Sequence, residues 1–351
     1  LVVTDDGLSK LPLYSKIFET LKKDGLKPVG HHEIHKNPVK SDVLSGVKNY
    51  HDKKCDSIIG LGGGASMDVA RAIALKAHHE QDLFDFEDSI GGDKYVTEDI
   101  PYFVTIPTTS GTGSEVGRST VISDNETKEK KILFSPRLMA KAVFADPELT
   151  LDLPFHVTAA TGMDALTHNI EAFLAKGFNP LCDGLALEGI KLVKESLEEA
   201  THKPSLEAQS KMMMAALIGA TAFQKGLGVV HSTAHPLSTL FDLHHGLANA
   251  IMLKYGLEFN LDSSKEKFEF LSKHLQLEDS SAGGFINFIS ELNQKLGLPH
   301  TLSSQGIKES DIEKTINDTE FEQYNFDVLI PNPVATTWFL NRENFINLFN
   351  L

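Results

Sequence analysis

Apolar positions in the first part of the chain alternate between two patterns. Short β-branched runs are followed by stretches in which apolar residues recur every three or four positions, the spacing of one helix face. The runs predict strands over residues 1–3, 57–61 and 102–106. The stretches predict helices over residues 14–23, 39–50 and 67–77. Strands alternating with helices predict a mostly parallel sheet covered on both faces.

The pattern changes near residue 153, beyond which no run resembles a strand. Helical periodicity instead covers residues 157–175, 180–200, 205–225, 246–259 and 285–296. We therefore expect an α/β domain over 1–153 and a helical domain over 154–351. No repeat or flexible linker separates them, so we expect the two halves to pack around a cleft.

Composition narrows the classes of function. The 351 residues suit two domains, and 48 acidic against 33 basic residues give a net charge of −15, with no basic stripe for nucleic acid. No apolar run approaches the roughly 18 residues of a membrane helix. Cys55 and Cys182 form no CxxC motif, which favours a reducing compartment, the cytoplasm. The chain opens at Leu1 on a strand pattern, so we expect the α/β domain to lack its first strand.

Two loops that follow predicted strands are suited to a nucleotide. The loop 60–66 contains Gly60, Gly62, Gly63 and Gly64, which let backbone N–H groups approach a pyrophosphate, although close packing alone could require them. The loop 107–115 offers hydroxyls to a phosphate or a nicotinamide amide, or is simply a polar turn. Asp5 could accept hydrogen bonds from a ribose and favour NAD over NADP, or cap a helix.

Histidines and one aspartate form the sharper signal. Asp164 and His168 are four residues apart, as are His231 and His235, and His245 follows ten residues later. Each pair alone is typical of a surface contact or a satisfied core histidine. Together, in apolar surroundings, they would be costly to bury without partners. A divalent cation held by one carboxylate and three imidazoles removes that cost and leaves a position open for substrate.

Longer motifs carry a resemblance to a known family. They are Gly-Leu-Gly-Gly-Gly-Ala-Ser-Met-Asp at 60–68, Pro-Thr-Thr-Ser-Gly-Thr-Gly-Ser-Glu-Val at 107–116, Asp-Pro-Glu-Leu-Thr at 146–150, Thr-Gly-Met-Asp-Ala-Leu-Thr-His at 161–168, Gly-Val-Val-His-Ser-Thr-Ala-His-Pro-Leu at 228–237 and His-His-Gly-Leu-Ala-Asn-Ala at 244–250. In this order, over about residues 1–260, the chain resembles the iron-containing (group III) alcohol dehydrogenases. The resemblance implies a dehydroquinate synthase-like architecture with the active site in the interdomain cleft, NAD as cofactor, and Fe²⁺, although Zn²⁺ fits the same donors.

The resemblance also assigns residues. It implies Asp164, His168, His231 and His245 as metal ligands, and His235 as a catalytic residue near the nicotinamide that relays a proton. The implied cofactor contacts are Asp5, Asn37, Gly63, Gly64, Ser66, Asp68, Thr108, Thr109, Thr112 and Lys130. Family members have about thirty further residues at the front and form homodimers or larger homo-oligomers, which we expect here too.

The implied reaction is hydride transfer between NAD(H) and a small primary alcohol, or a hydroxy acid, and its aldehyde or ketone. By family comparison Arg118 and the pair Gln224–Lys225 border the substrate pocket, where cations would suit an anionic substrate; the slightly favoured alternative is two solvated surface cations. A metal- and NAD-dependent lyase of the dehydroquinate synthase type and a non-catalytic metal- or nucleotide-binding relative remain alternatives. The pair Asp164 and His168 argues against the lyase, and the full ligand set against the non-catalytic relative.

Overall fold

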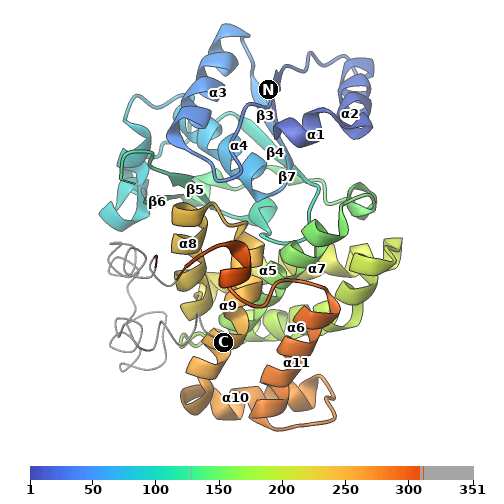
Figure 1. Ribbon diagram of the computed structural model, residues 1–351. Coiled ribbons are helices and arrows are strands. Elements are labelled where there is room, and N and C mark those ends of the chain that lie inside the picture. The colour runs from blue at the N-terminus through green and yellow to red at the C-terminus, as the bar shows by residue number, and fades with distance from the viewer. Residues whose placement is uncertain (128, 309–310, 312–351) are drawn as a thin grey trace. The chain divides into compact units, whose positions relative to one another are not determined.

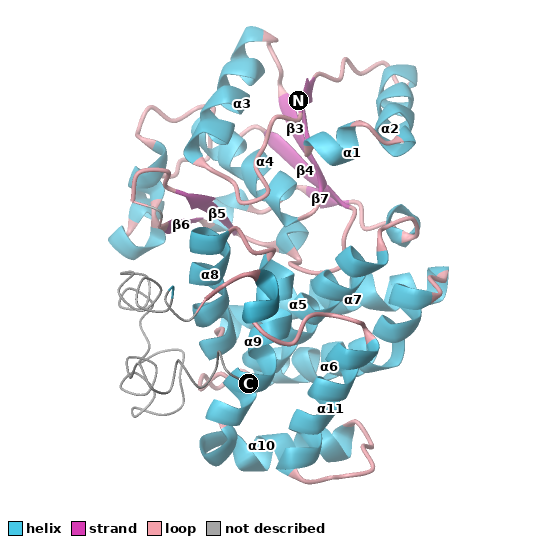
Figure 2. Ribbon diagram, viewed as in Figure 1, coloured by secondary structure: helices cyan, strands magenta, loops and turns pink. Residues whose placement is uncertain are grey.

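The computed structural model describes residues 1–127, 129–308 and 311, in two compact units (Figure 1). The α/β unit consists of Leu1–Thr109 and Gly113–Asp152. The helical unit consists of Ser110–Thr112 and the described residues from Leu153 onward. Figure 2 shows that the strands lie in the first unit, whereas the second is built from helices, so the expected fold class is confirmed.

The α/β unit is organised around a five-stranded sheet in the order β2-β1-β3-β4-β7. Its strands are β1 (Val2–Val3), β2 (Gly30–His31), β3 (Ser57–Gly62), β4 (Tyr102–Pro107) and β7 (Ala142–Val143). Every pairing in it is parallel, as predicted. In the β3–β4 register Gly62 lies opposite Pro107, so the loops that follow these strands begin at the same level of the carboxyl edge.

Helices bury the sheet on both faces. They are α1 (Asp6–Ser9), α2 (Pro12–Lys23), α3 (Lys40–Asp52) and α4 (Gly64–Lys76). The apolar stripe of α2, which includes Phe18, packs toward Val2 and Leu61, while α4 packs Ile73 in the cluster that contains Ile58. Side chains of one strand therefore enter two separate cores, which explains why β3 is almost continuously apolar.

Several elements of the α/β unit were not predicted from the sequence: the short strands β2 and β7, helix α1, and a second sheet. The second sheet is the antiparallel pair β5 (Ser119–Ser123) and β6 (Lys130–Phe134). Short 3₁₀ turns stand at Leu83–Phe86, Asp88–Ile90, Gly92–Tyr95, Ser114–Val116, Pro136–Leu138 and Pro147–Thr150. The fully buried guanidinium of Arg71 fastens the hairpin to α4, because it donates to Asp68 and to the carbonyl oxygens of Ser119 and Leu138.

The helical unit has no strand among its described residues. Its helices are α5 (Phe155–Leu174), α6 (Pro180–His202), α7 (Leu206–Ala222), α8 (Val229–Phe241), α9 (His245–Phe259), α10 (Leu261–His274) and α11 (Ala282–Lys295), with 3₁₀ turns at Phe223–Lys225 and Ser303–Gln305. The five helices predicted for this half are all present. Sequence periodicity missed α8, which contains Pro236, and α10.

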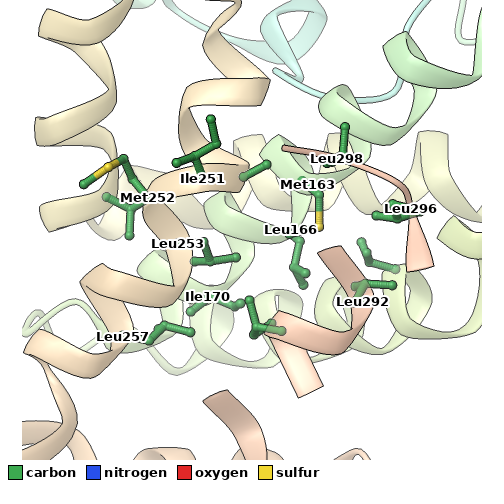
Figure 3. Close-up of a cluster of buried hydrophobic side chains, with 14 of the residues drawn as sticks. Met163, Leu166, Ile170, Ile251, Met252, Leu253, Leu257, Leu292, Leu296 and Leu298 are labelled. Atoms are coloured by element: carbon green, nitrogen blue, oxygen red, sulfur yellow. The ribbon is translucent and has the colours of Figure 1, made fainter. Parts of the chain in front are cut away.

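Helix α5 runs through the core of this unit. Its side chains Met163, Leu166 and Ile170 pack in one cluster with Leu253 of α9 and Leu292 of α11 (Figure 3). Because residues from Thr158 to Glu171 are buried all around the helix, each polar side chain there needs a partner.

Among the described residues, no single helix is both long and apolar enough to cross a bilayer. The pair Leu206–Lys225 and Val229–Phe241, bent by 108°, meets that criterion only when the two helices are taken together.

Candidate functional site

Helix α5 carries three acidic or imidazole side chains on one buried face. Asp164, His168 and Glu171 are spaced by four and three residues, which brings them onto neighbouring turns of the same face. They are exposed by only 1%, 5% and 3%. Such burial is tolerated only when the polar atoms meet partners from other elements, and here the partners come from α8 and α9.

The predicted metal ligands converge on one oxygen. Asp164 Oδ1 lies 3.9 Å from His168 Nε2, 3.7 Å from His231 Nε2 and 3.6 Å from His245 Nε2. A tetrahedral ion with bonds of about 2.1 Å separates its ligand atoms by about 3.4 Å. Each of the three imidazole nitrogens therefore lies within a few tenths of an ångström of the ligand spacing from Asp164 Oδ1, and one carboxylate with three imidazoles suits Fe²⁺ and Zn²⁺ alike.

The electrostatics of the cluster favour a cation. Burial by itself would raise the pKa of Asp164, but the surrounding imidazoles of His168, His245 and His231 outweigh burial and hold that pKa far below its usual range. Burial lowers the pKa of His168 to about 4, so this imidazole is neutral, as a ligand must be. Burial would also lower the pKa of His231, but hydrogen bonds to Asp164 and Glu171 raise it to about 9.

Two residues of the centre were missed by the sequence analysis. Glu171 Oε2 accepts a hydrogen bond from His231 Nδ1 at 2.6 Å. Asn249 Nδ2 donates to Asp164 Oδ1 at 2.7 Å, and Asn249 is fully buried. The signal was periodicity: Glu171 is seven residues after Asp164, and Asn249 is four after His245, each on the ligand-bearing face of its helix.

His235 lies one turn beyond His231 on α8 and is half-buried. Its ring centre is 5.3 Å from that of His245 and 6.2 Å from that of His231. The possible ligand atoms of Asp164, His168 and His231 all lie within 4.8 Å of one another, and His245 Nε2 lies 3.6 Å from Asp164 Oδ1. His235 lies beside this cluster, next to His245 and His231.

Most of the predicted cofactor residues of the α/β unit lie along the carboxyl edge of its sheet. Asp5 follows β1, Gly63 and Gly64 follow β3, and Thr108 and Thr109 follow β4. Thr108 donates its backbone N–H to the carbonyl oxygen of Gly62 at 3.0 Å, and a Cβ on Gly63 would lie 3.4 Å from Thr109 Oγ1, so the two loops touch.

Asp5 lies beside the glycine turn. One of its oxygens accepts from the backbone N–H of Leu8 at 2.9 Å and caps α1. The other oxygen would lie 3.6 Å from a Cβ on Gly62, whose φ of +139° favours glycine. The alternative of a helix-capping aspartate is thus observed, and it leaves the second oxygen beside the predicted phosphate loop.

The remaining predicted contacts are spread over several elements. Ser66 is buried in the first turn of α4, and Asp68 accepts from Ser114 Oγ at 2.7 Å and from Arg71 at 3.2 Å, so it ties loops together. Lys130 begins β6 opposite Ser123, whose backbone N–H donates to Pro38, next to Asn37. Thr112 belongs to the helical unit, where Gly111 packs against Thr161 of α5.

The two cations considered for the substrate pocket are both engaged. The Lys225 ammonium is paired with Asp183, and its side chain is only 2% exposed. This corrects the expectation, because Lys225 is neither a solvated surface cation nor a cation free to bind a substrate. The guanidinium of Arg118 lies over the ring of Phe134 at 5.2 Å.

Comparisons with known proteins agree with this geometry. The family model for iron-containing alcohol dehydrogenase matches residues 1–147, and the model for the C-terminal part of the Fe-containing alcohol dehydrogenase family matches residues 158–335. A 4-hydroxybutyrate dehydrogenase of Cupriavidus necator is 37% identical over 326 residues, 90% of this chain and 84% of that protein. An NAD-dependent methanol dehydrogenase of Bacillus methanolicus is 32% identical over 89% of this chain and 83% of its own length.

Solved structures lead to the same group. The crystal structure of a 1,3-propanediol oxidoreductase superposes with a TM-score of 0.91 at 32% identity, covering 99% of this chain and 91% of that one. These relatives support the oxidoreductase interpretation over the lyase alternative. The ligand geometry, the strand-end loops and these matches together show that the chain is an oxidoreductase and belongs to the iron-containing alcohol dehydrogenase family.

Proposed function

We propose that this enzyme interconverts a small primary alcohol and its aldehyde with NAD(H), using a divalent metal held by Asp164, His168, His231 and His245. The observation that carries the proposal is the convergence of three imidazole Nε2 atoms on Asp164 Oδ1, within 3.6–3.9 Å. Fe²⁺ is the ion expected from the family, and Zn²⁺ is the competing ion because its intrinsic affinity for such donors is higher.

The chain's contribution at this centre is electrostatic. A bound divalent ion supplies Lewis acidity toward the oxygen of the alcohol or aldehyde. One carboxylate and three neutral imidazoles leave the loaded centre with a net charge of about +1, which favours an oxygen that gains negative charge during the reaction. Phe223 packs against His168, with ring centres 5.0 Å apart, and excludes water from that side of the cluster.

His235 is proposed as the proton relay. Alcohol oxidation releases a proton that must leave the buried site, and an imidazole exchanges protons near neutral pH. Its ring lies near those of His245 and His231, and it is half-buried, as a group that passes a proton outward should be.

NAD is proposed to bind along the carboxyl edge of the parallel sheet. The glycine turn gives a pyrophosphate access to backbone N–H groups at the start of α4, where the helix dipole favours an anion. The free oxygen of Asp5 would accept hydrogen bonds from a ribose and repel a 2′-phosphate. The proposed contacts are Asp5, Asn37, Gly63, Gly64, Ser66, Asp68, Thr108, Thr109, Thr112 and Lys130.

The proposed substrate is a short uncharged alcohol or diol. Relatives carry names for 4-hydroxybutyrate, methanol and 1,3-propanediol, so the family accepts both anionic and neutral substrates. Because Lys225 is already paired with Asp183, it offers no free charge to a substrate carboxylate. A higher kcat/KM for 4-hydroxybutyrate than for 1,3-propanediol would refute this choice of substrate.

Two further properties are proposed from the family resemblance: assembly as a homodimer or larger homo-oligomer, and a cytoplasmic location. Light scattering on the eluting peak of a size-exclusion column tests the first, and cell fractionation the second.

The test of the activity itself is the change in absorbance at 340 nm. Protein reconstituted with Fe²⁺ without oxygen, and separately with Zn²⁺, is mixed with NAD and a panel of short alcohols. We expect NADH to form with at least one metal. Loaded enzyme that binds NAD and forms no NADH across the panel would refute the proposed function.

A further inference from the structure

The carboxylate of Glu171 lies behind His231, on the opposite side of the ring from the ligand atoms. Its Oε2 is 2.6 Å from His231 Nδ1, whereas His231 Nε2 is the nitrogen that faces Asp164. Glu171 is 3% exposed and His231 is also 3% exposed, so water does not compete for this hydrogen bond. The contact joins the last turn of α5 to the start of α8, across 60 residues of sequence.

The same carboxylate closes the first turn of α8. The helix begins after Gly228, which has no side chain to cap it. Glu171 Oε1 accepts from the backbone N–H of Val230 at 2.7 Å, and Oε2 lies 3.4 Å from the backbone N–H of His231. A Cβ on Gly228 would come within 2.7 Å of Oε1, so glycine is needed there for the carboxylate to approach. Glu171 therefore satisfies N–H groups that a buried helix start would otherwise leave unpaired.

We propose that Glu171 is a positioning residue of the metal centre, which fixes the tautomer and direction of His231 while anchoring the helix that carries it. A carboxylate accepts only, so His231 must place its proton on Nδ1 and keep the Nε2 lone pair for the ion. Carboxylates bound to the far nitrogen of a histidine ligand orient the ring and raise its basicity. The inference rests on the proposed metal centre.

Glu171→Gln tests the inference at constant size. The amide offers an oxygen to only one of two donors: if its NH₂ group faces His231, the ring must carry its proton on Nε2, and if it faces Val230, two N–H groups meet. Either arrangement disfavours the ligand tautomer. We expect the dissociation constant for Zn²⁺, measured by competition with a chelator, to rise about 10- to 100-fold. Glu171→Asp keeps the carboxylate, and its dissociation constant for Zn²⁺ should lie between those of the wild type and Glu171→Gln.

The matched control is Asn179→Ala. The Asn179 side chain caps α6 by accepting from the backbone N–H of Cys182, in the same unit and without touching a ligand. This variant should lower Tm by removing a helix cap, yet bind Zn²⁺ as the wild type does. In metal-free protein at a pH above the His231 pKa of about 9, where the ring is neutral, nitrogen-15 imidazole spectra should show the Nδ1–H form of His231 in the wild type and in Asn179→Ala, and its loss in Glu171→Gln.

An unchanged dissociation constant in Glu171→Gln, with only Tm reduced as in the control, would show that Glu171 is a cap alone and overturn the inference. An unchanged His231 tautomer would overturn it as well. Wild-type protein that binds neither Fe²⁺ nor Zn²⁺ would instead refute the proposed function, and the tautomer measurement would then decide the role of Glu171 by itself.

Discussion

Glu115 makes the stability of the α/β unit sensitive to pH. It lies in the short turn Ser114–Val116 and is 1% exposed. Neither carboxylate oxygen has a hydrogen-bond partner among the described residues. The nearby Arg71 directs its N–H groups to Asp68, Ser114, Ser119 and Leu138 instead. Burial raises the pKa of Glu115 to about 7, although its own backbone N–H and the charge of Arg71 act in the opposite direction.

The sign and size of the effect follow from the two protonation states. In the unfolded chain the pKa of Glu115 is near the ordinary value of 4.5, so between pH 4.5 and 7 the folded state binds more protons. The stability that the protonated Glu115 carboxyl contributes is complete below pH 4.5 and is lost as the pH rises through 7. With about 1.4 kcal/mol per pKa unit, the loss between pH 5 and pH 8 is about 2.5 kcal/mol. Glu115→Gln keeps the shape of the protonated acid and has no such loss.

Urea unfolding at pH 5, 6, 7 and 8 measures this difference. The free energy of unfolding of Glu115→Gln minus that of the wild type should increase by about 2.5 kcal/mol between pH 5 and pH 8. Glu126→Gln, at an exposed position of the same unit, is the matched control and should follow the wild type at every pH. If the free energies of unfolding of the wild type and Glu115→Gln differ by the same amount at every pH, then the carboxyl of Glu115 is ionised in the folded protein and the reasoning fails.

Three further predictions concern the helical unit. His231→Ala should lose bound metal and turnover together, whereas His235→Ala should keep its metal and have a lower kcat. Metal analysis together with kcat distinguishes the two variants. Full metal content with normal kcat in His231→Ala would refute the ligand assignment. Stripping the metal with a chelator should lower Tm, because an ion present at 100 times its dissociation constant stabilises by about 2.7 kcal/mol, and readdition of Fe²⁺ should restore it. Asp183→Asn should destabilise the protein by about 3 kcal/mol, since it leaves the buried Lys225 charge with no carboxylate and only a 3.4 Å contact to the carbonyl oxygen of Phe173, and Lys225→Met should destabilise it by less. Equal losses of the free energy of unfolding in urea would contradict that asymmetry.

The parts of the centre that could be predicted are those encoded locally. Asp164 and His168 share a helix face through their spacing alone, and the strand–glycine–helix pattern around Gly62 marks the loop that meets Thr108. Local pattern is informative there because the relevant neighbours are four residues away or lie at the ends of adjacent parallel strands.

The parts that could not be predicted depend on distant partners. Glu171 and Lys225 look like ordinary charged residues, and their roles appear only once His231 and Asp183, 60 and 42 residues away in sequence, are seen beside them. Helix α8 was missed because Gly228 and Pro236 both disfavour a helix, whereas a carboxylate from α5 supplies its cap. The hairpin β5–β6 was missed because each of its strands begins with two polar residues, so neither forms an uninterrupted apolar run.

The four proposed ligands occupy unequal places on their helices. Asp164 and His168 lie in the middle of the 20-residue α5, whereas His231 is near the beginning of α8 and His245 is the first residue of α9. Helix ends open far more readily than the middle of a buried helix. We therefore expect the ion to exchange through transient fraying at the start of α9, where the His245 side chain is 25% exposed, while α5 and the start of α8 held by Glu171 stay intact. The lifetime of the bound metal would then be set by local opening at one helix end, and not by unfolding of the unit.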